Sequence, residues 1–303
     1  MSDRSGIEWT EATWNPTTGC DQVSAGCDHC YALTLAGRLK AMGSPKYQTD
    51  GDPRTSGPGF GVAMHAAALD LPHRWRRGRR VFVNSMSDLF HRDVTDEYIA
   101  RVFAVMAATP QHTYQVLTKR PARARTLLSW PGFAALVQAV LDADGWPGQL
   151  VLPLPNVWLG VSAEDQRWAD IRLPQLLDTP AAVRWVSAEP LLGPVDLTRW
   201  LGLPGRLCGP VPASPGDLAV VRDWLRHLGA RRGIDWVVAG GESGPTPRPA
   251  DPDWARALRD QCTAAAVPFL FKQWGGRTPK SGGRELDGRI WEQMPSTAPA
   301  VSR

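Results

Sequence analysis

Three cysteines lie within eleven residues near the start of the chain, where Cys20, Cys27 and Cys30 have the spacing C-x6-C-x2-C. The chain has five cysteines, an odd number, so this density of thiols indicates metal or redox chemistry in a reducing compartment rather than a disulfide framework. Three thiolates would leave one iron of a four-iron cluster open to a substrate or cofactor. A structural zinc site needs four ligands, and His29 could supply the fourth, so zinc stays open as the alternative.

Ionisable residues recur just after the expected strands. In parallel barrels the functional residues lie directly after the C-terminal ends of the strands. Burying so many charges on one face without partners or a ligand is costly, so the pattern predicts a polar active site. The residues at these positions are Asp88, Lys119, Arg120, Glu164, Asp165, Glu189, Glu242 and Lys272. The predicted catalytic residues among them are Lys119, Glu164, Glu189 and Lys272.

Short runs of β-branched and aromatic residues, bounded by turn residues, predict the strands that must position these side chains. The expected strands are 81–84, 114–118, 157–161, 183–187, 235–239 and 269–272, and a seventh is weakly indicated near 9–13. Segments with helical character lie between most of them, at 96–108, 133–143, 167–177 and 252–266. This alternation predicts an α/β fold, with a parallel (β/α) barrel or partial barrel.

Two stretches interrupt the alternation. Residues 43–61 are rich in Gly, Pro and Thr and residues 201–216 in Pro and Gly, so both are expected to be long loops or insertions. We expect one α/β barrel domain over 1–276, followed by a partly disordered C-terminal tail over 277–303. No apolar run approaches the roughly 20 residues that cross a bilayer, and the N-terminus lacks the apolar stretch of a signal peptide. The sequence therefore predicts a cytoplasmic protein without membrane association.

A basic segment precedes the first strong strand, with arginines on both sides of Trp75: Arg74, Arg76, Arg77, Arg79 and Arg80. The net charge is +4 and the chain has 14 tryptophans. Basic patches attract phosphates and tryptophan can stack on bases, so these features favour a nucleic acid or a nucleotide as substrate, with a solvated loop as the alternative. Three histidines share no ligand spacing and are expected at the surface or rim: His65, His91 and His112.

The early cysteine loop, the aromatic residue after its last cysteine and the following α/β repeats resemble the radical S-adenosylmethionine (SAM) superfamily. The usual loop of that superfamily is C-x3-C-x2-C, with an aromatic residue before the last cysteine, where this chain has His29. A larger set of motifs, from residue 7 to about 276, resembles a three-cysteine family of phage and bacterial proteins of unassigned activity, the phage Gp37/Gp68 type. The motifs, besides the cysteine loop, are Trp14-Asn15-Pro16, Asn84-Ser85-Met86-Ser87-Asp88, Leu117-Thr118-Lys119-Arg120-Pro121, Gly160-Val161-Ser162, Ser187-Ala188-Glu189-Pro190 and Gly240-Gly241-Glu242-Ser243-Gly244.

The radical SAM resemblance implies a [4Fe-4S] cluster on Cys20, Cys27 and Cys30, in a barrel of the radical SAM or TIM type. It implies that S-adenosylmethionine binds the open iron and is cleaved to a 5′-deoxyadenosyl radical, which abstracts hydrogen from a substrate. The arginines, Lys119-Arg120, the tryptophan count and the phage context of the three-cysteine family favour a nucleic acid or a nucleotide, modified or repaired, as that substrate. An electron donor, a reductase or a flavodoxin or ferredoxin, would be a partner. The residues expected to bind the cofactor are Asn84, Ser85, Ser87, Asp88, Gly240, Gly241 and Glu242.

Two alternatives stay open. Gly240-Gly241-Glu242 resembles the Gly-Gly-Glu segment by which radical SAM enzymes contact the amino group of the methionine moiety. Because it follows a late strand in this chain, it is also consistent with a tight turn that presents one carboxylate. The second function in view is a non-catalytic nucleic-acid-binding protein whose N-terminal loop is held by zinc or by an iron–sulfur cluster.

Overall fold

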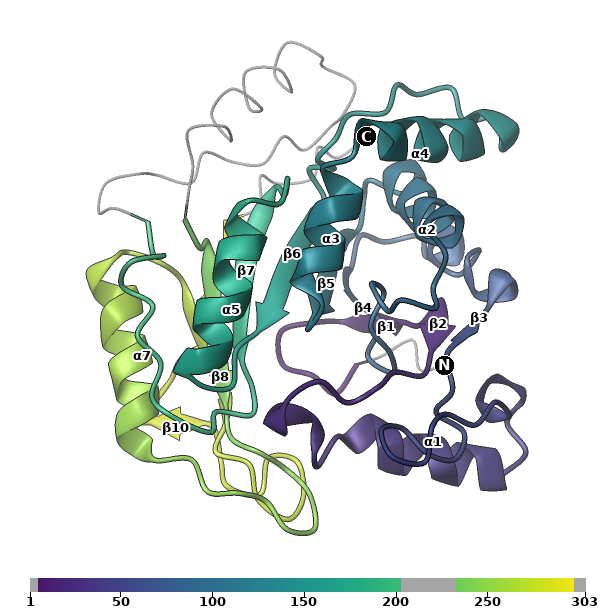
Figure 1. The fold of residues 1–303 in the computed structure, drawn as a ribbon. Helices are drawn as coiled ribbons and strands as arrows, with labels where there is room; N and C mark the ends of the chain where they lie inside the picture. Colours follow the sequence, from purple (N-terminus) through teal and green to yellow (C-terminus); the bar gives the residue numbers. More distant parts are fainter. Residues whose placement is uncertain (1–4, 203–232, 297–303) are drawn as a thin grey trace. The chain divides into compact units, whose positions relative to one another are not determined.

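The computed structural model describes residues 5–202 and 233–296 (Figure 1). The chain divides into two compact units, Met1–Val157 (unit 1) and Trp158–Arg303 (unit 2), which are treated one at a time. The main strands follow the order β1-β4-β5-β6-β7-β8-β9. The first three belong to unit 1 and the other four to unit 2, and the strand pairs within each unit are parallel.

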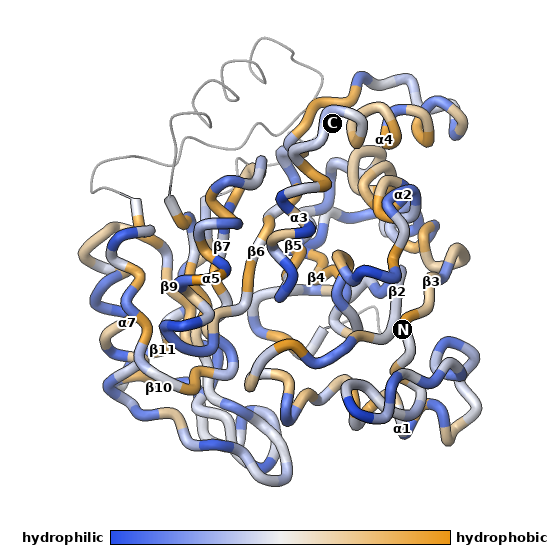
Figure 2. The backbone as a smooth tube through the Cα atoms, viewed as in Figure 1, coloured by the Kyte–Doolittle hydropathy of each residue, from blue (hydrophilic) through white to orange (hydrophobic). Residues whose placement is uncertain are grey.

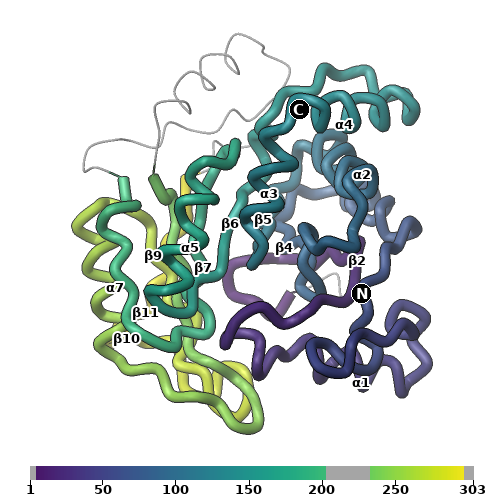
Figure 3. The backbone as a smooth tube through the Cα atoms, in the orientation of Figure 1, coloured from purple at the N-terminus to yellow at the C-terminus, as the bar shows by residue number. Residues whose placement is uncertain are grey.

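The sheet of unit 1 consists of β1 (Ala12–Trp14), β4 (Arg80–Val83) and β5 (Thr113–Thr118). Figure 3 shows the purple N-terminal segment lying beside β4, and the register pairs Ala12 with Val81 and Val81 with Tyr114. All three of these side chains are fully buried, as expected for parallel strands covered on both faces. A second, two-stranded sheet pairs β2 (Thr17–Thr18) with β3 (Ala63–Met64) in antiparallel fashion.

Helices and short turns make up much of the rest of unit 1 in the described residues. They are α1 (Tyr31–Ala41), α2 (Asp96–Ala108), α3 (Pro121–Leu128) and α4 (Pro131–Ala143), with single 3₁₀ turns η1 (Ala25–Cys27), η2 (Pro45–Tyr47), η3 (Ala66–Ala68) and η4 (Pro72–Arg74). The Thr95 side chain caps α2 by accepting a hydrogen bond from the Tyr98 amide at 3.2 Å. Helix α2 packs on α4, where the rings of Phe103 and Phe133 meet edge to face with centroids 5.2 Å apart.

Unit 2 repeats the strand–helix alternation. Its elements are β6 (Val157–Ser162), α5 (Gln166–Leu177), β7 (Val183–Ala188), β8 (Trp236–Gly240), α7 (Pro252–Ala264) and β9 (Phe269–Gln273). The hydropathy colouring of Figure 2 shows hydrophilic and hydrophobic residues alternating along α7, which buries one side only. In the core, Trp185 lies against Trp236 with ring centroids 5.2 Å apart. Gly160 makes room for Trp185, because a Cβ at that position would lie 2.3 Å from its indole ring.

A hairpin of β10 (Glu285–Leu286) and β11 (Arg289–Ile290) lies in the expected tail. The chain after it pairs with β9, since the Phe271 amide donates to the Trp291 carbonyl at 2.9 Å and the Gln293 amide to the Phe269 carbonyl at 3.1 Å. The predicted boundary at residue 276 and the disorder of the tail stay predictions, and residues 297–303 lie outside the described part.

The α/β class with parallel strands is confirmed, and each expected strand and helix overlaps an observed one. The main strands of the described residues number seven, one fewer than the eight of a complete barrel. Residues 43–61 form a folded loop that contains η2, whereas most of 201–216 lies outside the described residues. In the described ranges no single helix is long and apolar enough to cross a membrane. Among the helices described, α3 and α4 reach the required length and composition when taken together, but they are bent by 75° at the break.

Candidate functional site

The cysteine loop runs from the end of β2 to the start of α1 in unit 1. Cys20 follows Gly19, which has a φ of +86° and passes so close to the Gly61 carbonyl that a Cβ would lie 2.1 Å from its oxygen. Cys27 ends the turn η1, and Cys30 is the N-cap residue of α1. All three are free thiols of intermediate burial. The position before Cys20 therefore requires a glycine. All three thiols lie on one short loop between β2 and α1.

The loop at 43–61 folds back onto the first cysteine. The Cys20 amide donates to the Phe60 carbonyl at 3.3 Å. The Thr55 hydroxyl donates to Asp21 Oδ1 at 2.8 Å. Asp21 is thereby tied to a segment more than thirty residues later in the chain, and the position of Cys20 depends on that segment.

His91 completes this attachment, and its expected surface position is wrong. Its side chain is 0% exposed, and its Nε2 lies 3.0 Å from Asp21 Oδ2. His112 is also buried, since it accepts from the Arg79 amide at 3.2 Å and its Nε2 lies 3.1 Å from the Pro72 carbonyl. Ligand spacing could not reveal these roles, because both imidazoles are satisfied by partners distant in sequence.

The sulfurs of Cys20 and Cys30 lie against an apolar cluster formed by Ala32, Ala36, Tyr47, Phe60 and Met86. Burial raises the pKa of Cys20 to about 12, the Asp88 carboxylate adds to the rise, and Arg120 opposes it. Burial also raises the pKa of Cys30, against the opposing effect of backbone amides at the start of α1. Both groups are therefore protonated thiols at neutral pH unless a metal replaces the proton.

Two cations from the end of β5 flank these thiols. One guanidinium nitrogen of Arg120 donates to Cys20 Sγ at 3.8 Å and to the Asp21 carbonyl at 3.2 Å. The positive charge of Lys119 partly offsets the rise in the pKa of Cys30 that burial causes. The strand-end position of both residues was predicted, but their proximity to two of the cysteines was not.

The fit of the three thiols to a metal group can be judged from their surroundings. In residues 5–202 and 233–296, no three His, Cys, Asp or Glu side chains converge closely enough to hold a metal ion as they stand. The thiols nevertheless share one neighbourhood, because charge on Cys27 raises the pKa of both Cys20 and Cys30. Three thiolates suit a metal group that prefers sulfur ligands, such as an iron–sulfur cluster. Because the loop has no fourth cysteine, one metal position of that group would stay open. The three side chains would have to rotate toward one another to bind it.

The polar residues after β4 mostly join parts of unit 1. The Asp88 carboxylate accepts from Thr118 Oγ1 and from the Lys119 amide, at 2.8 and 2.9 Å. Other contacts join Ser85 to Asn15 and Ser87 to Thr17, and the Tyr31 hydroxyl donates to the Ser85 carbonyl at 2.6 Å. The role of Ser85, Ser87 and Asp88 in binding a cofactor stays a prediction.

Asn84 differs from its neighbours. Its φ is +64°, which is rare for a residue with a side chain, and only 4% of its surface is exposed. Its Nδ2 donates to Thr17 Oγ1 at 3.0 Å, but its Oδ1 is buried and accepts no hydrogen bond from the described residues. A strained, buried amide with an unused acceptor is a feature typical of binding sites.

In unit 2, Glu189 and Lys272 meet across the end of β8. Lys272 Nζ lies 2.6 Å from Glu189 Oε2, and the two side chains are 24% and 12% exposed. Gly240 lies between them, because a Cβ there would be 3.4 Å from both Glu189 Oε2 and Lys272 Cβ. The structure thus brings together two of the predicted catalytic residues, although their catalytic role stays a prediction.

Two further predicted residues of unit 2, Glu242 and Glu164, are held in ion pairs. Glu242, 5% exposed, accepts from the Arg248 amide at 2.9 Å and from its guanidinium. Glu164 and Arg172 form a pair at 2.8 Å with exposures of 0% and 1%. Gly241 allows a close backbone approach, since a Cβ would lie 2.0 Å from the Trp274 carbonyl. A completely buried Glu164 favours a structural role over a catalytic one.

A comparison with protein families gives one match: "Protein of unknown function (DUF5131)" matches residues 4–295. The chain belongs to the DUF5131 family. A search of curated proteins returns no match. The phage naming inferred from the motifs stays a prediction.

Two solved structures are similar to this DUF5131 chain, both of spore photoproduct lyase. A cysteine-to-serine mutant of that enzyme is 15% identical with a TM-score of 0.38, over 87% of this chain and 63% of the other. The enzyme complexed with dinucleoside spore photoproduct is 13% identical with a TM-score of 0.34, over 81% of this chain and 59% of the other. The chain thus spans about three fifths of the length of the structures it matches.

The basic segment of this DUF5131 chain lies at the opposite end of β4 from the cysteine loop. Arg80 begins the strand and Asn84 follows it, so roughly 13 Å separates the two ends. Trp75 is buried and anchors the segment, with the Arg79 guanidinium 5.2 Å from its ring. The arginines around it that are exposed are Arg74, Arg76 and Arg77. The patch is real, but it lies away from the thiols.

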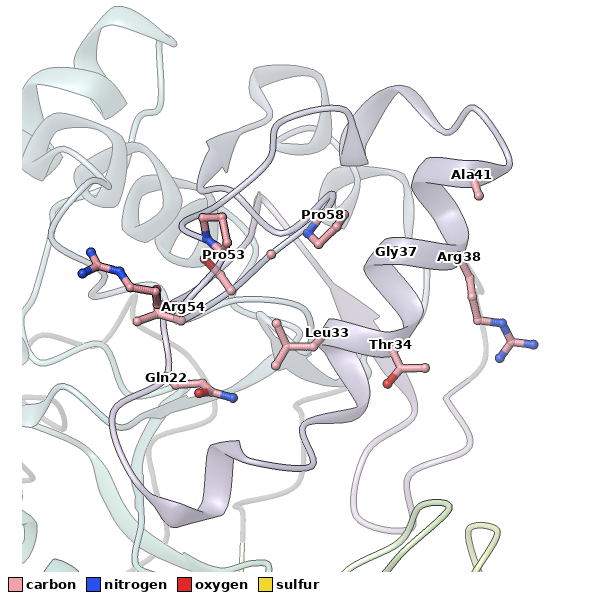
Figure 4. A pocket seen from close by; sticks show the side chains of 12 residues that line it. Gln22, Leu33, Thr34, Gly37, Arg38, Ala41, Pro53, Arg54 and Pro58 are labelled. Carbon is pink, nitrogen blue, oxygen red and sulfur yellow. The ribbon is translucent and has the colours of Figure 1, made fainter.

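A groove of about 550 Å³ runs between α1 and residues 53–58 (Figure 4). Leu33 and Pro58 line its interior, and the Arg38 side chain points away from it. The groove adjoins the cysteine loop through Gln22, whose Nε2 donates to the Cys27 carbonyl at 3.2 Å.

Proposed function

We propose that this DUF5131 chain is an iron–sulfur enzyme of the radical SAM type, with Cys20, Cys27 and Cys30 as the protein ligands of a [4Fe-4S] cluster. The observation that carries the proposal is the set of three neighbouring thiols in one loop, flanked by two cations, with no fourth cysteine in the loop sequence. When bound, a cluster with an open iron supplies the electron that cleaves S-adenosylmethionine to a 5′-deoxyadenosyl radical.

The protein's own residues provide the environment for this chemistry. The apolar cluster beneath Cys20 and Cys30 excludes water from the ligand side. Arg120 and Lys119 offset the negative charge that three thiolates bring to the loop. The unused Oδ1 of Asn84 is an acceptor that the amino group of a bound cofactor would satisfy.

We infer that the substrate is a nucleic acid or a nucleotide. The exposed arginines around Trp75 support this, because such a patch attracts the phosphate backbone. Because these arginines lie at the far end of β4 from the cysteine loop, they would contact the phosphate backbone at a distance from the nucleotide that reacts. The tryptophans give little support, since seven of the thirteen in the described residues, among them Trp14, Trp158, Trp185 and Trp236, are buried.

The first experiment is anaerobic reconstitution with iron and sulfide, followed by electron paramagnetic resonance (EPR) of the dithionite-reduced protein with and without S-adenosylmethionine. A four-iron signal that changes on adding the cofactor supports the proposal. The Cys27→Ser variant should lose the signal. Cys262→Ala should keep it, because that thiol is buried in α7 and takes no part in the loop.

A colourless protein that holds one zinc ion would contradict the radical SAM proposal. It would favour the alternative of a nucleic-acid-binding protein whose N-terminal loop is held by a metal.

The one-electron donor would be a reductase, flavodoxin or ferredoxin. Reduction of the cluster by such a protein in place of dithionite would support that partner.

Nucleic-acid binding is tested through its salt dependence. Replacing Arg74, Arg76 and Arg77 by glutamine should lower the slope of log affinity against log salt by about 3, at roughly 0.9 per phosphate contact. Three exposed arginines elsewhere in unit 1 serve as the matched control: Arg38, Arg54 and Arg92. Equal slopes for the two triple variants would remove the support for a nucleic-acid substrate.

A further inference from the structure

The Arg120 guanidinium contacts a cysteine sulfur, with one nitrogen 3.8 Å from Cys20 Sγ. We propose that Arg120 is a positioning residue that hydrogen-bonds the Cys20 ligand of the cluster and raises the reduction potential of that cluster. The inference rests on the proposed function and adds to it a residue that sets the redox chemistry.

The position of Arg120 is built into the end of β5. Its amide donates to Thr118 Oγ1 at 2.8 Å, and that hydroxyl donates to the Asp88 carboxylate at 2.8 Å. The guanidinium then reaches the Asp21 carbonyl at 3.2 Å, directly after Cys20. A continuous set of hydrogen bonds therefore runs from the end of β4 to the first cysteine.

The guanidinium also has one donor that the described residues do not use. Arg120 Nε is buried and has no acceptor among the described residues. A planar guanidinium presents several donors in a fixed geometry, so one nitrogen can hold Cys20 while another meets an acceptor next to it. Because no described residue supplies that acceptor, we assign it to a bound group.

The effect on the potential follows from charge. Reduction makes the cluster and its thiolates more negative, so a donor to a ligand sulfur stabilises the reduced form more than the oxidised form. Hydrogen bonds to sulfur, net charge and solvent exposure are the terms that set cluster potentials. Lys119 adds a charge near Cys30, but its ammonium is a point charge without the forked geometry of Arg120.

The test is an EPR-monitored redox titration of the reconstituted protein. Arg120→Gln should lower the midpoint potential by about 59 mV, which corresponds to a tenfold change in the ratio of oxidised to reduced cluster in a one-electron couple. The midpoint potential of Arg120→Lys, which keeps the charge, should fall by less. Arg77→Gln is the matched control: it removes one charge from unit 1 at the far end of β4 and should leave the potential unchanged.

The outcomes separate this inference from the proposed function. A parent protein that forms no cluster overturns both. Arg120 variants that hold a full complement of iron at the parent's potential overturn the inference alone, as does an equal shift in Arg77→Gln. If Arg120→Gln loses iron, Arg120→Lys decides: a potential below that of the parent supports the inference, and an unchanged potential overturns it.

Discussion

Replacing Asp88 by asparagine changes one atom at the point where β4 and β5 end together. The carboxylate is 6% exposed. Its Oδ1 accepts from the Phe90 amide at 3.0 Å and from Thr118 Oγ1 at 2.8 Å, and its Oδ2 accepts from the Lys119 amide at 2.9 Å and from the same hydroxyl at 3.0 Å. Both oxygens are thus used by the protein itself.

The cost of the change follows from this geometry. An asparagine NH₂ in either orientation faces a backbone amide, of Lys119 or of Phe90, which then loses its acceptor. An unsatisfied buried donor costs about 1–3 kcal/mol, and the remaining hydrogen bonds lose the contribution of the charge. We therefore expect Asp88→Asn to lower the free energy of unfolding by roughly 2–4 kcal/mol.

The assay is urea unfolding of the metal-free protein under reducing conditions. Asp93→Asn is the control, because that carboxylate lies close by in the chain and is 59% exposed. Thr118→Val and the double variant complete a cycle, in which the two changes should couple because they share one hydrogen bond. If Asp88→Asn unfolded at the same urea concentration as the parent, the structural role would be wrong. A loss of the cofactor-induced EPR change in that variant would then favour the cofactor-binding role predicted from the sequence.

Gly19→Ala should destabilise the protein more than Gly43→Ala in urea unfolding: both glycines have a positive φ, but only at Gly19 would the new Cβ lie 2.1 Å from a backbone carbonyl. Equal losses would refute the importance of the close approach. Burial lowers the pKa of His112, so the unfolded chain takes up a proton at higher pH than the folded one. The free energy of unfolding should fall as the pH drops below about 6.5, by up to about 1.4 kcal/mol per pH unit, and His112→Gln should lose this part of the slope. Lys272→Met leaves the Glu189 carboxylate without its ammonium partner and should cost about 1–3 kcal/mol in urea unfolding, a loss that Glu189→Gln in the same chain should reduce.

The strands and helices were predictable because their signals are local. A buried parallel strand must be apolar on both faces, so the sequence around Val81, Val183 and Val237 shows it without any knowledge of the neighbours. The helix from Asp96 to Ala108 carries its own N-cap at Thr95. The expectation for 201–216 falls mostly outside the described residues, so it stays a prediction.

The roles of individual charged residues were harder to predict from the sequence. A place after a strand predicts which edge of the sheet a side chain occupies, but not whether its charge is already paired. Glu164 follows a strand as predicted, yet Arg172 on the next helix neutralises it completely inside the protein. His91 has no motif around it, and its partner Asp21 lies seventy residues away in the sequence.

By itself the sequence determined the three thiols of one loop and the alternating strands that carry the polar residues, since both depend on neighbours along the chain. Only the tertiary structure decided what surrounds those thiols. The Arg120 guanidinium and the Cys20 sulfur are separated by one hundred residues, and they meet because parallel strands bring successive C-terminal ends to the same edge. Charge, burial and hydrogen bonding at a sulfur are properties of that edge, and no local pattern of residues contains them.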